Sequence, residues 1–195
     1  MSIKVTKTLI VHGLDGSPAP HWQDWWAATD PTALNVDLPT PHAPVPEAWE
    51  AELAGMILRH PDSIVVGHSL GAVLIARLLA KWPQLRIGAA LLVAPAETMG
   101  NDRIGHFGPI PERPFDVPAL VVASTTDPWM PLPRAEGLAR AWGSDLINLG
   151  AAGHINVAAG FGPWPQGKQL RDQLVARIAP APRALAGTRN QRAIR

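Results

Sequence analysis

The sequence predicts an α/β protein of three layers, in which a mostly parallel sheet of about six strands lies between two layers of helices. Short aliphatic and β-branched runs alternate along the chain with longer stretches whose apolar residues recur at helical spacing. Most of the short runs are apolar throughout, which is typical of parallel strands buried on both faces. The chain of 195 residues has the length of a single domain, which we expect to span residues 1–178.

The expected strands and helices follow one another in alternation. The predicted strands are Thr8–His12, a weaker candidate at Asn35–Leu38, Ile64–Gly67, Ala89–Val93, Ala119–Ala123 and Leu146–Leu149. The predicted helices are Trp22–Thr29, Pro46–Arg59, Leu70–Trp82, Leu132–Trp142 and Gln166–Ile178. Because a helix joins most pairs of successive strands, this order predicts right-handed crossovers and a doubly wound sheet.

Two stretches rich in Pro and Gly interrupt the alternation. Thr40–Val45 and Pro95–Pro118 are predicted to be loops that lie over one end of the sheet. The second stretch has only 24 residues between its flanking strands, which is too few for a separate lid domain. We therefore expect a minimal fold without a lid and with an open, shallow pocket.

The composition excludes several classes of function. Lys and Arg (17) nearly balance Asp and Glu (16), so no global charge favours nucleic acid or an anionic membrane, and a small molecule is the expected partner. Without cysteine, the chain has no disulfide, no thiol nucleophile and no thiolate ligand. The histidines do not have metal-ligand spacing, and we expect neither metal nor cofactor. Neither a signal peptide nor an apolar run long enough for a membrane span is visible, which predicts a cytoplasmic protein.

The last segment, residues 179–195, differs from the rest in its charge. It holds four of the 17 basic side chains and no acidic one, with little apolar periodicity. Residues 1–178 keep 13 basic against 16 acidic side chains, a formal charge of −3. Because such a segment cannot bury an apolar face, we expect a disordered, solvated basic tail.

The pentapeptide Gly67-His68-Ser69-Leu70-Gly71 has the pattern G-x-S-x-G between a predicted strand and a predicted helix. In this context the pattern is typical of a sharp turn that lifts the serine hydroxyl clear of the sheet. Backbone strain at such a turn costs ~1–3 kcal/mol, and the glycines allow strand and helix to approach closely. Ser69 is therefore the candidate nucleophile, and the alternative is a serine that only caps the helix.

A serine hydroxyl needs a general base, and the base needs a carboxylate to orient it. His154 is the candidate base, because it follows the strand Leu146–Leu149 in a loop of small residues. Asp127 is the candidate carboxylate, because it follows Ala119–Ala123 at the carboxyl end of the sheet, where open α/β sheets place their sites. The order Ser, Asp, His along the chain supports this assignment.

The other histidines and aspartates fit these roles less well. His12 and His68 are expected in the core or in supporting hydrogen bonds. The surface is the expected place of the remaining histidines, which are His21, His42, His60 and His106. Asp145 precedes its strand and so faces the wrong end of the sheet. Asp102 and Asp116, in the long loop, remain less favoured alternatives for the carboxylate that orients the base.

Two backbone amides are candidates for an oxyanion hole. The amide of Leu70 lies at the predicted helix N-terminus, where unpaired N–H groups favour negative charge. The second donor is expected from the loop after the first strand, at Leu14, with Gly13 as the alternative. Tryptophans near these loops are candidates to line the substrate pocket, although core packing is as frequent a role for this residue, and they are Trp22, Trp129 and Trp164.

The sequence resembles the compact α/β-hydrolases of the retinoblastoma-binding protein 9 type, a serine hydrolase family. The likeness covers most of residues 7–178 through a set of short motifs, which are His12-Gly13, His21-Trp22-Gln23, Trp25-Trp26, the Gly67–Gly71 pentapeptide, Asp127-Pro128, Gly153-His154-Ile155-Asn156, Gly160-Phe161-Gly162 and Trp164-Pro165. It implies a triad of Ser69, Asp127 and His154 that hydrolyses small esters or amides. The namesake binds the retinoblastoma pocket through a Leu-x-Cys-x-Glu peptide, so a chain without cysteine is not expected to have that partner.

These observations together predict a serine hydrolase that cleaves small ester or amide substrates through an acyl-enzyme on Ser69. Two other functions stay open on the sequence. A binding or regulatory protein can keep the same fold without its chemistry, because a fold does not determine a function. An acyltransferase would form the same acyl-enzyme and pass the acyl group to an alcohol or amine.

Overall fold

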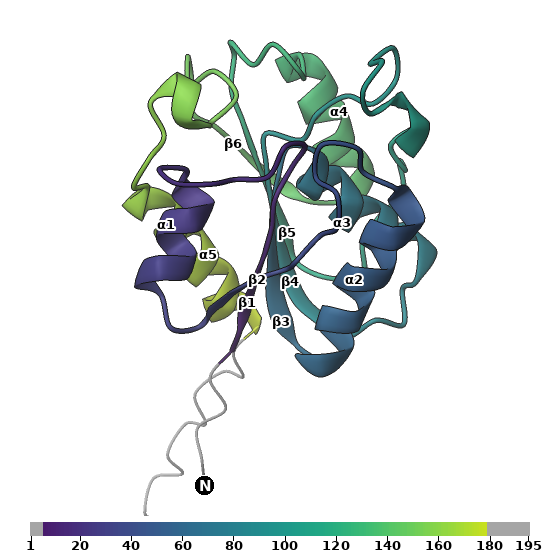
Figure 1. The fold of residues 1–195 in the computed structure, drawn as a ribbon, viewed down its shortest axis with the longest axis vertical. Coiled ribbons are helices and arrows are strands. Elements are labelled where there is room, and N and C mark those ends of the chain that lie inside the picture. Colours follow the sequence, from purple (N-terminus) through teal and green to yellow (C-terminus); the bar gives the residue numbers. More distant parts are fainter. Residues whose placement is uncertain (1–5, 179–195) are drawn as a thin grey trace, which may run out of the picture.

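The computed structural model describes residues 6–178 and contains a parallel six-stranded sheet in the order β2-β1-β3-β4-β5-β6 (Figure 1). The strands are β1 Thr8–Val11, β2 Ala33–Asn35, β3 Ser63–His68, β4 Ile87–Val93, β5 Ala119–Ala123 and β6 Asp145–Asn148. The helices are α1 Trp22–Thr29, α2 Pro46–Arg59, α3 Leu70–Lys81, α4 Leu132–Trp142 and α5 Pro165–Ile178, with short 3-10 turns η1 Gly105–Phe107 and η2 Val157–Ala159. The predicted α/β class is confirmed, and the predicted tail lies outside the described residues.

The helices cover both faces of the sheet. α1 and α5 lie on one face, and α2, α3 and α4 lie on the other (Figure 1). Each face has its own apolar core, the first built around Trp22 and Trp26 and the second around Trp49 and Trp142. Within residues 6–178, no helix combines the length and the apolar character that a membrane crossing requires.

The strand order indicates which end of the sheet carries the functional site. The chain runs from β1 outward to β2 and then returns to β3 on the other side of β1, so the winding direction reverses between β1 and β3. Open α/β sheets bind ligands at the carboxyl ends of the strands at such a reversal. The register pairs Val11 of β1 with Gly67 of β3, which places the loop after β1 beside the loop after β3.

The second strand differs from the weaker prediction at Asn35–Leu38. Its paired residues are Ala33–Asn35, and the amide of Val36 still donates to the carbonyl of Ile10. The amide of Leu38 instead donates to the carbonyl of Val36, which bends the chain away from the sheet. Val36 and Leu38 are apolar because they pack in the core from a loop, and not because they belong to a strand.

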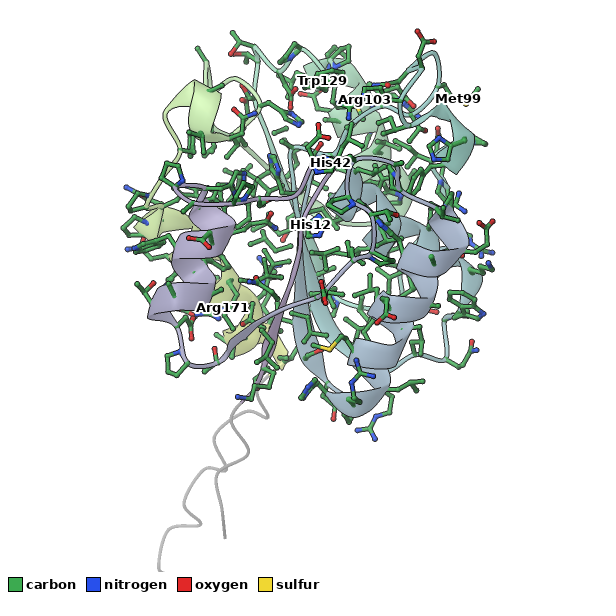
Figure 2. The ribbon with its side chains drawn as sticks, viewed as in Figure 1. His12, His42, Met99, Arg103, Trp129 and Arg171 are labelled. Carbon is green, nitrogen blue, oxygen red and sulfur yellow. The ribbon has the colours of Figure 1, made fainter. Side chains whose placement is uncertain are left out.

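A buried ion pair ties α5 to the opposite end of the sheet, away from the site. The guanidinium of Arg171 donates from Nη2 to Oδ2 of Asp30 over 2.7 Å and from Nη1 to the hydroxyl of Thr8. Both charged side chains are only 10% exposed. Figure 2 shows Arg171 low on the α1/α5 side, far from Trp129 at the end where the strands finish.

Candidate active site

The turn between β3 and α3 holds Ser69 in a strained conformation. Ser69 has φ 56° and ψ −123°, which an L-residue rarely adopts, and α3 begins at the next residue. The residues two positions before and after Ser69 must be glycines, because a side chain there would clash with the backbone. A Cβ on Gly67 would lie 2.7 Å from the amide nitrogen of Ala72, and one on Gly71 would lie 2.3 Å from the carbonyl oxygen of Val11. The predicted elbow geometry is therefore present.

Ser69, His154 and Asp127 lie in hydrogen-bond contact in that order. Oγ of Ser69 is 2.9 Å from Nε2 of His154. Nδ1 of the same ring is 2.9 and 3.0 Å from the two carboxylate oxygens of Asp127. The side chains of His154 and Asp127 are 8% and 2% exposed, so water screens this pair little. The carboxylate also accepts a hydrogen bond of 2.9 Å from the amide of Trp129.

Two hydroxyl residues join the loop that carries Asp127 to the loop that carries His154. Oγ of Ser124 donates to the carbonyl of Gly150 over 3.0 Å and accepts from the amide of Ala152 over 3.0 Å. Oγ1 of Thr126 accepts from the amide of Gly153 over 3.0 Å. The sequence reasoning missed these supports, although the run of hydroxyls before Asp127 is visible in the sequence.

His68 connects the serine turn to the backbone of His154. Its Nε2 lies 2.8 Å from the carbonyl oxygen of His154, so this nitrogen carries the proton and donates. Burial, together with the nearby rings of His154 and His21, holds the pKa of His68 well below its ordinary value, and the ring is neutral. The expected supporting role of His68 in a hydrogen bond matches this geometry.

His21 lies in the pocket wall and not on the surface, which corrects the prediction. It is 6% exposed, and its ring centre is 5.0 Å from that of His68. Its Nδ1 accepts a hydrogen bond of 3.1 Å from the amide of Gln23 at the start of α1. Burial, together with the nearby ring of His154, lowers the pKa of His21 to about 4. The ring is therefore neutral at physiological pH.

Leu70 and Leu14, the expected donors of the oxyanion hole, have backbone amides that take part in no hydrogen bond within residues 6–178. Leu70 is the first residue of α3, so its N–H has no partner within the helix. In the loop after β1, the amides of Asp15 and Gly16 bond to Pro41 and Gly13, and within residues 6–178 no hydrogen bond uses the amide of Leu14. Gly13 packs directly on the serine, because a Cβ there would lie 2.8 Å from Cβ of Ser69.

A pocket of about 220 Å³ opens beside Ser69 and His154. Its wall comes from the loops after β1, β3, β4, β5 and β6, and its other lining residues are Gly13, Leu14, Asp15, Gly16, His21, His68, Ala96, Asn101, Arg103, Ile104, Trp129 and Asn156. A second hollow of about 460 Å³ lies on the far side of His154, against the loop from Ala151 to Ala159.

Of the tryptophans predicted to line the pocket, only Trp129 does so. It is 48% exposed and borders both hollows. Trp22 and Trp164 are 0% and 5% exposed and belong to the core between α1 and α5, so this part of the prediction is wrong. Trp22 instead supports the site from behind, since its Nε1 donates to the carbonyl of Ile155 over 2.9 Å.

An ion pair lies at the pocket mouth. Both terminal nitrogens of Arg103 donate to the carboxylate of Asp15, over 2.8 and 2.7 Å, and Nδ1 of His42 is 3.0 Å from the same carboxylate. The Arg103 guanidinium lowers the pKa of Asp15 to about 2. Figure 2 shows Arg103 near Trp129 at the end where the strands finish. The pair joins the loop after β1 to the loop after β4.

The described residues offer no evident metal site. Among residues 6–178, no three side chains of the types His, Asp and Glu are grouped so that they could hold an ion. The acidic candidates Asp102 and Asp116 lie in the long loop, and neither lines the pocket.

The parallel sheet, the helices on both faces and the strained serine turn define the class of α/β-hydrolases. The model of the serine hydrolase family matches residues 8–173, and the chain belongs to this family. This confirms the resemblance at the level of the family. We therefore describe the protein as a hydrolase. Among the curated proteins, none matches the sequence.

Several solved structures are similar to this chain over most of its length. A YdeN-like hydrolase of Pectobacterium atrosepticum is 32% identical, with a TM-score of 0.82 over 90% of this chain and 93% of the other. The ydeN gene product of B. subtilis is 22% identical, with a TM-score of 0.73 over 88% of this chain and 100% of the other. Est1E of Butyrivibrio proteoclasticus, solved with ferulic acid, is 14% identical, with a TM-score of 0.65 over 89% and 90% of the two chains, and supports the fold alone.

Proposed function

We propose that this hydrolase cleaves small ester or amide substrates through an acyl-enzyme on Ser69, with His154 as general base and Asp127 as the carboxylate that orients it. The observation that carries the proposal is the continuous contact from Oγ of Ser69 through both ring nitrogens of His154 to Asp127. The carboxylate fixes the tautomer with the proton on Nδ1, which leaves the lone pair of Nε2 directed at the serine hydroxyl.

In the acylation half of the cycle, Oγ of Ser69 attacks the substrate carbonyl carbon while its proton passes to Nε2 of His154. The carbonyl oxygen becomes an oxyanion that accepts hydrogen bonds from the amides of Leu70 and Leu14, with Gly13 as the alternative to Leu14. The bond to the leaving group then breaks, and Nε2 returns the proton to the leaving alcohol or amine. An ester of Ser69 remains.

Water completes the cycle. His154 takes a proton from a water molecule as its oxygen attacks the acyl carbon, and the same proton then returns to Oγ of Ser69 as the acid is released. The burial of His154 and Asp127 matters at both steps, because a screened carboxylate would stabilise the transient imidazolium less.

Hydrolysis of p-nitrophenyl acetate by wild type and by Ser69→Ala tests this proposal. We expect the variant to fold as wild type does. It should hydrolyse the ester no faster than a control without enzyme. Ser63→Ala is a matched control, because Ser63 lies buried at the amino end of the same strand, away from the pocket. Turnover by Ser69→Ala at the wild-type rate would refute the assignment. Added alcohol or amine in the same assay would reveal acyl transfer as a new product.

A further inference from the structure

Three polar side chains of the pocket wall share one property that the proposed mechanism does not use. In each of them, the hydrogen-bond acceptor is already occupied by a backbone amide of the protein. The donor of each side chain, in contrast, has no partner within residues 6–178 and remains for a ligand.

Asn101 belongs to the loop after β4. Its Oδ1 accepts a hydrogen bond of 3.0 Å from the amide of Arg103. Since a backbone N–H can only donate, this contact identifies the oxygen of the side-chain amide and leaves the NH₂ group as the free end. Within residues 6–178, no hydrogen bond uses that NH₂ group.

Asn156 has the same arrangement in the loop after β6. Asn156 precedes η2, and its Oδ1 accepts from the amide of Ala159, the last residue of that turn, over 3.2 Å. The NH₂ group again has no partner within the described residues. Asn101 and Asn156 come from different loops and both line the first pocket, and Asn156 also borders the second hollow.

His21 contributes a third donor. Its Nδ1 accepts from Gln23, so the single proton of the neutral ring is on Nε2. No hydrogen bond within residues 6–178 uses this Nε2. In that part of the chain, the buried side-chain atoms without a hydrogen-bond partner are Nε1 of Trp26 and Oγ of Ser63. Nε2 of His21 has no partner and is not one of these atoms, so it is accessible from the pocket that the ring lines.

The acceptors of the pocket are fewer and mostly engaged. The carboxylate of Asp15 is paired with Arg103 and His42, which also leaves this charged cluster close to neutral. Nδ1 of His68 is the exception, because Nε2 of this ring donates to His154 and the ring lines the pocket, so the wall has one such acceptor beside the three donors. The wall is therefore rich in donors and has little net charge.

The two hollows have different positions relative to the proposed reaction. Ser69 and His154 both line the first pocket, whereas the second hollow borders His154 but not Ser69. The first pocket is built around Ser69, Gly13 and Leu14 and so receives the acyl part.

We infer that the pocket selects uncharged acyl groups that carry an oxygen acceptor, such as an ether, hydroxyl or carbonyl oxygen, near the scissile carbonyl. The inference rests on the proposed function of Ser69. An apolar acyl chain of the same size would leave the donors of His21, Asn101 and Asn156 without a partner, and unpaired buried donors are what makes such sites discriminate against apolar analogues.

The test compares two esters of equal size, p-nitrophenyl methoxyacetate and p-nitrophenyl butyrate, which differ by an oxygen in place of a methylene. We measure the ratio of their kcat/KM values in wild type, His21→Phe and Asn101→Asp. The intrinsic reactivities of the esters cancel when ratios are compared between proteins. His21→Phe keeps a ring without the donor, and Asn101→Asp keeps the oxygen that accepts from Arg103 but replaces the donor with an acceptor.

We expect the methoxyacetate preference to fall about two- to tenfold in each variant, the size of one hydrogen bond. The first matched control is His60→Phe, at the end of α2. The second is Asn148→Asp, because Oδ1 of the exposed Asn148 accepts from the amide of Gly150, as Oδ1 of Asn101 accepts from Arg103, but Asn148 lies outside the pocket. Both controls should keep the wild-type ratio. An unchanged ratio in both pocket variants would overturn this inference alone, whereas ester hydrolysis by Ser69→Ala at the wild-type rate would overturn the proposed function with it.

Discussion

Nε2 of His68 lies 2.8 Å from the backbone carbonyl oxygen of His154, although the two residues are 86 positions apart. His68 directly precedes Ser69 in the turn after β3. The hydrogen bond therefore joins the backbone of the proposed nucleophile to the backbone of the proposed base. Burial keeps the pKa of the ring well below the ordinary value, so the ring is neutral and its single proton lies on Nε2, which donates to this carbonyl.

The first prediction concerns this bond. His68→Leu removes the donor and leaves a buried carbonyl without a partner, which should cost about 1–3 kcal/mol of unfolding free energy in urea titration. It should also lower kcat for p-nitrophenyl acetate about tenfold with KM little changed, because the base is displaced and binding is not. His68→Gln can still donate and should recover part of kcat. Equal kcat in the His68→Leu variant and in wild type would contradict a positioning role.

The second prediction concerns the carboxylate. Asp127→Asn keeps the shape of the side chain but favours the wrong tautomer of His154, so kcat should fall by about 10⁴ while the fold is preserved. Steady-state kinetics and circular dichroism measure the two properties. Asp116→Asn is the control, because Asp116 is exposed in the long loop and outside the pocket. A loss of less than tenfold in Asp127→Asn would argue against the assigned role.

The third prediction concerns the close approach of the serine turn to β1. A Cβ on Gly71 would lie 2.3 Å from the carbonyl oxygen of Val11 and 2.5 Å from that of His12, and neither backbone atom can move freely. Gly71→Ala should destabilise the protein by more than about 3 kcal/mol, since a backbone clash in the core cannot relax. Gly137→Ala provides the contrast, because its Cβ would meet only the end of Arg140 on helix α4. Gly137→Ala should stabilise the protein by about 0.5–1 kcal/mol. Thermal unfolding of both variants and of wild type measures these changes.

The fourth prediction concerns the pH dependence of stability. Burial raises the pKa of Asp30, but hydrogen bonds from Thr32 and Arg171 outweigh this and hold it at about 2. A carboxylate with a lowered pKa stabilises the fold above the pKa of the unfolded chain, and this contribution is lost as pH falls through the folded value. Asp30→Asn should therefore cost about 2 kcal/mol at neutral pH, the loss of a charged hydrogen-bond pair.

The difference in unfolding free energy between wild type and Asp30→Asn should shrink as the pH falls from 3.8, the ordinary pKa of the carboxyl group, to about 2. Denaturant titrations across that range measure it. Asp172→Asn is the matched control, because Asp172 bonds to the same Arg171 but is 65% exposed. An exposed partner should contribute less than about 0.5 kcal/mol. Equal effects of the two variants would show that burial of Asp30 does not matter.

The sequence predicted the elements whose patterns are local. The helices at Trp22–Thr29, Pro46–Arg59 and Leu132–Trp142 and the strand Ala119–Ala123 have the predicted bounds, because apolar periodicity and Pro or Gly mark their ends. The candidates Ser69, Asp127 and His154 each follow a recognisable strand, which is why the sequence placed them at one edge of the sheet, and their side chains lie in contact there.

What the sequence could not predict depends on contacts between distant segments. His21 was expected at the surface because it lies in a loop context in the sequence, but the ring of His68, from the end of β3, packs against it. Trp164 was expected in the pocket and is in the core, because Gly167 on α5 leaves room for its ring, where a Cβ would lie 2.4 Å from Cε3 of Trp164. The apolar residues Val36 and Leu38 suggested a strand, and tertiary packing of a loop explains them instead.

The central claim is that Ser69 forms the covalent intermediate, and intact-protein mass spectrometry after treatment with a fluorophosphonate tests it most directly. Wild type should gain the mass of one phosphonyl group, and peptide mapping should place it on Ser69 within the segment from His68 to Leu70. Ser69→Ala should gain none under the same conditions. Modification of Ser69→Ala to the same extent, or a wild-type adduct mapped to another residue, would contradict the account.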